Sequence, residues 1–289
     1  MYDLEYVKKR KRRRLAALVS LFSSIGVASL VVVSFLGRTV GTFTVSIQNS
    51  TVKLALCEKS NFEEPTSYLR IDNIPNKYTE YTYKWLENKG FDVIDDENRS
   101  YYFGLSKDGE AMGFLKYTFY IKNIGTKLAR YTLSVNLEES TKGDNGKTLD
   151  NTLRIMLFEN DPAVEDSHNF DVYAKELTDS LYKVYAIGET KPTNRAFISR
   201  TPAPSANGNV YEDETHRLAE PFLTDKGTAI IQKEVDNFGI DDMMRYTVVY
   251  WLEGFSSIPE YDESGKPLEP KGAKIKLSID INASSNGIA

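Results

Sequence analysis

The fold of this chain is indicated most clearly by residues 114–137, whose sequence is FLKYTFYIKNIGTKLARYTLSVNL. Apolar side chains occupy every second position in its first part, at Leu115, Tyr117, Phe119 and Ile121, and the alternation resumes from residue 131. A period of two places one set of side chains on one face of an extended strand. The residues between the two parts are turn formers, so the stretch predicts two adjacent strands joined by a turn.

The same alternation predicts strands elsewhere, at residues 43–47, 52–56, 153–158, 172–174, 182–187, 244–252 and 275–281. Residues 244–252 are apolar on nearly both faces, which is typical of a central strand. One short helix is predicted at 79–89, and a helix at 174–183 stays an open alternative. Short strands without long intervening helices predict an all-β, antiparallel β-sandwich. The first and last strands are expected to pair.

A segment of 22 residues without a charge, LAALVSLFSSIGVASLVVVSFL, covers residues 15–36. As a helix rising about 1.5 Å per residue it is about 33 Å long, enough to cross a bilayer. Seven consecutive cations precede it, namely Lys8, Lys9, Arg10, Lys11, Arg12, Arg13 and Arg14. Positive flanks mark the cytoplasmic side. We therefore expect a cytoplasmic tail at 1–14, a transmembrane helix at 15–36 in contact with lipid, and an extracellular domain at 37–289.

A cleaved secretory signal is the alternative to this membrane anchor. The apolar core of a signal peptide usually has about 7 to 15 residues and ends at a small-x-small site. This core is longer, and residues 39–41 form only a weak cleavage site, so an uncleaved anchor is favoured. The remainder after residue 37 holds 29 cations and 39 anions, a net charge of −10. Such an acidic domain does not indicate nucleic acid as a partner.

Cys57 is the only cysteine, so the chain forms no intramolecular disulfide. Its place in the alternation puts its side chain on the face of Lys53, away from the apolar set, and we expect it to be half-buried. Residues 191–210 contain three prolines and a glycine among Thr, Ser and Asn. This composition predicts an exposed loop without a core face, serving as a disordered or ligand-binding tip within a long loop at 188–228.

Two segments near the C-terminus resemble a known family. Residues 245–254, RYTVVYWLEG, are followed after a polar loop by KGAKIKLSI at 271–279. They resemble the C-terminal strand pair of TasA- and camelysin-type surface proteins of Gram-positive bacteria, and residues 117–137, 153–158 and 172–174 fit the same order. The most specific part is Trp251-Leu252-Glu253-Gly254. The resemblance implies a jelly-roll fold, export to the cell surface and, for members that assemble, biofilm-matrix fibres.

Some members of that family have been described as metalloproteases, so zinc is the first chemistry to consider. The chain has only His168 and His216, without a His-Glu-x-x-His helix, whereas catalytic zinc needs several clustered nitrogen or sulfur ligands. Residues 254–258, GFSSI, lack the second glycine of a serine nucleophile elbow. Paired carboxylates of a glycoside hydrolase stay open as an alternative. We expect no enzyme activity, no cofactor and no metal.

The sequence therefore predicts a membrane-anchored surface protein with a structural or adhesive role, which associates with itself or with other surface proteins. The alternative is a carbohydrate-binding module, because the 18 tyrosines and two tryptophans could stack on sugars. The candidate partner surface is the aromatic cluster Tyr101, Tyr102 and Phe103. Its alternative interpretation is a core strand, since aromatic residues are favoured in strands by packing.

Overall fold

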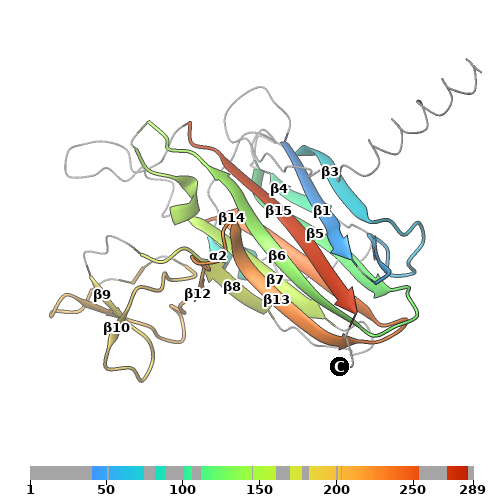
Figure 1. Ribbon diagram of the computed structural model, residues 1–289. Helices are drawn as coiled ribbons and strands as arrows, with labels where there is room; N and C mark the ends of the chain where they lie inside the picture. Colours follow the sequence, from blue (N-terminus) through green and yellow to red (C-terminus); the bar gives the residue numbers. More distant parts are fainter. Residues whose placement is uncertain are drawn as a thin grey trace, which may run out of the picture.

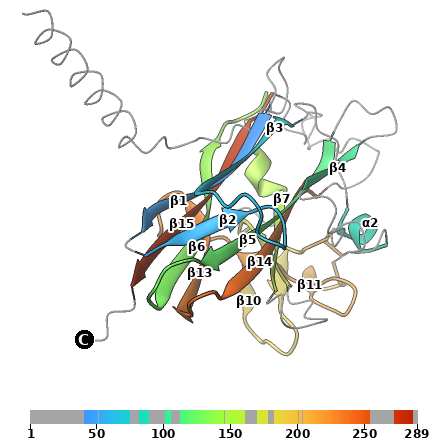
Figure 2. The same cartoon turned by 90° about the vertical axis from the view of Figure 1, so that its right-hand side faces the viewer.

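The computed structural model describes most of the chain after residue 40, namely residues 41–50, 52–74, 82–88, 101–105, 112–144, 146–160, 170–177, 182–199, 201–202, 204–253 and 272–285. These residues form two β-sheets packed face to face and a smaller sheet beside them (Figures 1 and 2). The predicted all-β sandwich is confirmed. The predicted cytoplasmic tail and transmembrane helix lie outside the described residues. Within the described part, no helix is long and apolar enough to cross a membrane.

The first sheet has five strands in the order β13-β6-β15-β1-β3. Its strands are β1 (Gly41–Ser50), β3 (Tyr68–Ile74), β6 (Ala129–Ser140), β13 (Ala229–Phe238) and β15 (Ile275–Ser285). All but one of its neighbouring pairs are antiparallel, and the exception is β1 with β15. The predicted pairing of the first and last strands is thereby confirmed.

The second sheet has seven strands in the order β12-β8-β7-β14-β5-β2, with β4 also paired to β5. Its strands are β2 (Leu54–Cys57), β4 (Tyr101–Leu105), β5 (Met112–Asn123), β7 (Leu153–Asn160), β8 (Phe170–Ala174), β12 (Glu220–Pro221) and β14 (Met243–Leu252). The 3-10 turn η2 (Leu149–Asn151) precedes β7. Strand β14 lies between β5 and β7 and is buried along most of its length, which confirms its predicted central place.

The inner faces of the two sheets enclose the main hydrophobic core. Phe43 of β1 packs edge-on against Tyr117 and Tyr250, with ring centroids 5.5 and 5.4 Å apart. The hydroxyl groups of Tyr131 and Tyr246 share a hydrogen bond of 2.8 Å across the core. Each sheet therefore contributes one apolar face, as the period-two pattern requires.

The two strands of residues 114–137 are not neighbours in one sheet, and the prediction of an adjacent pair is wrong. β5 belongs to the seven-stranded sheet and β6 to the five-stranded sheet. The turn between them crosses the end of the sandwich. Both arrangements put one apolar face of each strand into the same core, so alternation cannot distinguish a hairpin from a crossing.

A second hydrophobic layer covers the outer face of the seven-stranded sheet. It contains α2 (Tyr83–Asn88), which confirms part of the helix predicted at 79–89. It also includes Ala196 and Ile198. Phe197, between them, packs in a third cluster with Val184 and Val210 of the small sheet. That sheet consists of β9 (Lys183–Tyr185), β10 (Pro192–Thr193) and β11 (Asn209–Tyr211) and is seen at the lower left of Figure 1. Residues 174–177 and 182–183, the described parts of the alternative helix at 174–183, are not helical.

Two expectations about burial are wrong. Ala196, Phe197 and Ile198 are buried, so the proline-containing segment at 191–210 does have a core face. Cys57 is buried rather than half-buried, and its thiol donates a hydrogen bond to the Glu63 carbonyl oxygen at 2.8 Å. In both cases the partner is a segment that covers the sheet from outside, which strand periodicity alone does not reveal.

Candidate functional site

The predicted aromatic site, Tyr101, Tyr102 and Phe103, forms most of strand β4 along one half of β5. Tyr101 is exposed, and the other two side chains lie outside what the structure describes. Gly104 permits the close approach of β4, because a Cβ atom there would stand 2.2 Å from a ring carbon of Phe114. The strand itself is observed, and its role as a partner surface stays a prediction.

Three turns meet where β1 ends. Asn123 stands at the start of one of them and is hydrogen-bonded to another. Its side chain is fully buried. The amide Nδ2 donates to the carbonyl oxygens of Lys127 at 2.9 Å and Phe238 at 3.0 Å, and Oδ1 accepts from the Gly125 N–H at 3.0 Å. We call this part of the molecule the Asn123 end, made up of residues 52–53, 123–128 and 238–242.

Backbone hydrogen bonds complete the Asn123 end. The N–H of Asn123 donates to Asp242 O at 3.0 Å, and the N–H of Asp241 donates to Asn123 O at 2.9 Å. The N–H of Ile124 donates to Lys53 O at 2.9 Å. The three turns therefore hold one another in place, so side chains that point outward from them are positioned before any partner binds.

Three large aliphatic side chains point outward from these turns. Ile124, Leu128 and Ile240 keep 48%, 43% and 53% of their surface exposed. Nearby, Lys122 Nζ lies 3.2 Å from Asp241 Oδ1. This apolar group stands at the end of the sandwich opposite the start of β1, about 30 Å away for a ten-residue strand. It is a candidate contact surface, because the turns that carry these three exposed side chains are hydrogen-bonded to one another, and neighbouring exposed apolar side chains are typical of interaction sites.

The outer face of the five-stranded sheet carries a polar network centred on Asp280. Oδ1 of Asp280 accepts hydrogen bonds from Ser46 Oγ and from Gln48 Nε2, each at 3.0 Å. Oδ2 accepts from Asn136 Nδ2 at 3.0 Å. Three strands, β1, β15 and β6, are thus linked by side chains as well as by their backbone ladders. Figure 1 shows this face uncovered.

The small sheet presents two stacked aromatic rings. Tyr185 and Tyr211 are partners in neighbouring parallel strands, with ring centroids 5.2 Å apart and planes inclined by 22°. Tyr211 is on the outermost strand and is exposed, and its hydroxyl accepts a hydrogen bond from Asn209 Nδ2 at 3.3 Å. Hydrogen bonds from Asn209 and Asn207 lower the pKa of Tyr211. A free aromatic face beside amide groups suits a sugar ring.

A buried charged cluster joins the small sheet and α2 to the sandwich. Arg154 Nε donates to the Phe197 carbonyl oxygen at 3.0 Å. Burial lowers the pKa of Arg154 to about 10, and the nearby Glu253 opposes this shift. Glu253 Oε2 accepts from Trp251 Nε1 at 2.7 Å and from the Tyr83 N–H at 2.9 Å. Trp251 and Glu253, from the most specific part of the family resemblance, therefore hold neighbouring segments together.

A second ionic cluster closes one side of the sandwich. Lys233 Nζ of β13 lies 2.7 Å from Glu159 Oε1 of β7 and 2.9 Å from Asp171 Oδ2 of β8. Burial alone would lower the pKa of Lys233, but hydrogen bonds with Glu159, Asp171 and Tyr173 raise it. The cluster links the two sheets, and its partial exposure limits its contribution to stability.

Catalytic chemistry finds little support in the described residues. His216 Nδ1 lies 3.0 Å from Asp213 Oδ1 in an exposed turn that also contains Thr215, and His168 is outside the described part. Hydrogen bonds from Thr215 and His216 lower the pKa of Asp213. Over the described ranges, no group of three or more His, Cys, Asp or Glu is placed to hold a metal ion. The His216 turn is a local capping arrangement.

Comparison of the chain with models of protein families, with curated proteins and with solved structures gave no significant match. The resemblance to TasA- and camelysin-type proteins therefore stays a prediction.

Sequence reasoning missed the three surfaces described above. The sequence places Asn123 in the turn after the first strand; in the structure it is the last residue of β5, and its contact with Phe238 joins positions 115 residues apart. Asp280 lies in the strand predicted at 275–281. Its partners Ser46 and Gln48 are on the first strand, which was expected to pair with it, but Asn136 is on β6, a neighbour that periodicity does not identify. The pairing of Tyr185 with Tyr211 depends on a parallel contact across 26 residues. Single-sequence patterns contain no signal for such pairs.

Proposed function

We propose that this protein is a single-pass membrane protein with a jelly-roll-like domain displayed at the cell surface, in a structural or adhesive role. The cationic block at 8–14 and the uncharged segment at 15–36 support the membrane anchor. Strand β1 begins at Gly41, five positions after Leu36. The domain therefore starts close to the bilayer, with its Asn123 end directed away from it.

The Asn123 end is the observation that carries the adhesive role. Fully burying an aliphatic side chain contributes about 1.5–3 kcal/mol. Because Ile124, Leu128 and Ile240 are already about half buried, covering all three contributes about 3 kcal/mol. That is too little for tight association in solution, where lost rigid-body freedom costs more. Confinement of many copies to one membrane raises their effective concentration and makes such a weak contact effective.

The partner proposed for this surface is a second copy of the chain. The Asn123 end holds exposed Lys53 and Lys127 as well as exposed Asp241 and Asp242 around the aliphatic group. A surface with both signs of charge can face a copy of itself so that unlike charges meet, as in a two-fold symmetric contact.

The test is a measurement of self-association by the full chain in lipid vesicles, by energy transfer between donor- and acceptor-labelled copies over a range of protein-to-lipid ratios. The variant Ile124→Ser/Leu128→Ser/Ile240→Ser is expected to weaken association at least tenfold, consistent with losing a few kcal/mol. Ile187→Ser is the control, since Ile187 is an exposed aliphatic residue two positions after β9, outside the Asn123 end. A strictly monomeric wild type, or equal association of both variants, would exclude this contact.

A carbohydrate-binding role is the second candidate, supported by the stacked pair Tyr185 and Tyr211. The Tyr211→Ala variant is expected to lose retention on immobilised cell-wall polysaccharide, because stacking on its exposed ring would contribute most of the contact. Tyr182→Ala, which changes another exposed tyrosine outside the stacked pair, serves as control. Equal retention of both variants and the wild type would remove this candidate.

A further inference from the structure

Strands β1 and β15 run side by side in the same direction. Val45 pairs with Ile279, Ser46 with Asp280 and Ile47 with Ile281. Figure 1 shows the two arrows pointing the same way. In a parallel pair, the beginning of one strand and the end of the other lie at opposite ends of the ladder. Tension applied at Gly41 and at Ser285 therefore pulls the two strands past each other along their axes.

Strand β1 is bonded along both edges. On the side away from β15 it pairs antiparallel with β3, in a register that includes Phe43 with Ile71 and Val45 with Leu69. A strand drawn out along its own axis must break both ladders together, whereas a strand peeled sideways breaks its bonds one after another. Since each hydrogen bond contributes only modestly, simultaneous loading is what makes the pair resistant.

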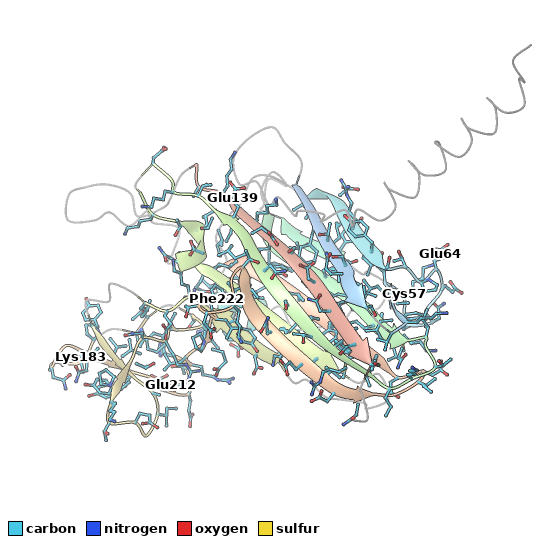
Figure 3. All side chains as sticks on the ribbon, in the orientation of Figure 1. Cys57, Glu64, Glu139, Lys183, Glu212 and Phe222 are labelled. Carbon is cyan, nitrogen blue, oxygen red and sulfur yellow. The ribbon has the colours of Figure 1, made fainter. Side chains whose placement is uncertain are left out.

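Side chains fix β1 on both faces of the sheet. Phe43 and Val45 are fully buried in the core between the sheets. On the outer face, Asp280 of β15 accepts hydrogen bonds from Ser46 and Gln48 of β1 and from Asn136 of β6. These bonds to a carboxylate are stronger than bonds between neutral groups. Asp280 thus connects the strand next to the predicted anchor to the centre of the five-stranded sheet. Figure 1 labels β1, β15 and β6, and Figure 3 shows the same strands with their side chains in the same orientation.

We propose that β1, β15 and the Asp280 network form a force-bearing unit, which transmits tension between the membrane segment and the rest of the domain. This inference rests on the proposed surface role for its biological use, but the mechanical property itself belongs to residues 41–285. An adhesive domain held at one end by its anchor and at the other by a partner is loaded along β1.

The test is single-molecule force spectroscopy on the full chain in detergent, with two attachment geometries. Handles at the N- and C-termini load β1 against β15 in shear. Handles at the C-terminus and at a cysteine introduced as Lys53→Cys pull on neighbouring ends of the same strands and peel them apart. Lys53 is exposed, and the native Cys57 is buried and does not compete for the handle. Both geometries use a protein of the same fold, so only the direction of force differs.

The unfolding force at equal loading rate is expected to be about twofold or more higher in shear than in peeling, because several ladder bonds must break at once. Equal forces would overturn the proposal. Asp280→Asn keeps one acceptor oxygen and loses the other, so its lifetime under constant shear force is expected to fall about tenfold. Glu234→Gln, a carboxylate change on the same face without contact to β1, should leave that lifetime unchanged.

Unequal effects of Asp280→Asn in the two geometries separate a mechanical role from a general loss of stability. The variant should shorten the lifetime in shear and have less than half that effect in peeling. The same effect in both geometries would assign Asp280 to stability alone and overturn its place in the unit. The proposed surface location is tested separately, by the orientation of the chain in cells. The force measurements use the isolated chain, so either proposal can fail without the other.

Discussion

Replacing Asn123 by alanine removes the side chain that joins the turns of the Asn123 end. Three hydrogen bonds are lost, to Lys127 O, Phe238 O and the Gly125 N–H. Each contributes about 1 kcal/mol net, so Asn123→Ala is expected to lower the free energy of unfolding by about 3 kcal/mol. In a domain of this size that corresponds to a decrease in melting temperature of roughly 6–12 °C.

The assay is thermal and urea unfolding of the full chain in detergent, followed by circular dichroism at 215–220 nm, a range chosen for strand signal. Asn282→Ala is the matched control, because Asn282 is exposed on β15 and its change should stay within about 0.5 kcal/mol. Asn123→Ala should also weaken self-association, because the turns that carry Ile124 and Ile240 lose the hydrogen bonds of the Asn123 side chain that link them. An Asn123→Ala protein as stable as the Asn282→Ala control would refute the reasoning.

The other predictions concern the core and the sheet edges. Burial raises the pKa of four core tyrosines, namely Tyr117, Tyr131, Tyr246 and Tyr250. In the unfolded chain these tyrosines lose their protons above about pH 10, whereas in the folded protein they keep them. The free energy of unfolding should therefore be constant below about pH 10 and fall above it, by about 1.4 kcal/mol per pH unit for each tyrosine. Tyr250→Phe should reduce this slope in alkaline urea titrations and not destabilise at pH 7, because the Tyr250 hydroxyl is buried and has no hydrogen-bond partner in the described structure; an unchanged slope would contradict it. Gly104→Ala should lower the free energy of unfolding by about 1–3 kcal/mol, because the added methyl group overpacks against Phe114. The rate of amide hydrogen exchange should then rise along β4 but not along β8. Lys233→Met should lower the free energy of unfolding, measured in urea, by about 1 kcal/mol at low salt and by less at high salt, because its ion pairs are partly exposed and salt screens them. The control is Lys226→Met, which changes an exposed lysine.

Strand positions were predictable from sequence because each strand buries one face, and alternation follows from that requirement alone. Strands β7, β14 and β15 lie where their patterns predict them, and the apolar run at 244–252 also predicted a central position. Sheet membership was not predictable in the same way. β5 and β6 lie in opposite sheets and bury their apolar faces in the same core. Their alternation would be the same in a hairpin.

The candidate surfaces were less predictable than the strands. Residues 196–198 are buried in a segment whose prolines and small polar residues indicate an exposed loop, because a distant sheet provides the covering surface. Asn123 and Asp280 have ordinary turn and strand-face positions in sequence, and only their long-range partners distinguish them. Side-chain networks between strands depend on sheet order, which a single sequence does not specify.

The orientation of the domain relative to the membrane can be measured with one cysteine, because the native Cys57 is buried. In cells that express Lys183→Cys, a membrane-impermeant maleimide should label position 183, which is exposed on β9 and lies outside the Asn123 end, without lysis. The paired variant Lys11→Cys, in the cationic block, should be labelled only after lysis. Labelling of Lys11→Cys in intact cells, with Lys183→Cys protected until lysis, would contradict the account.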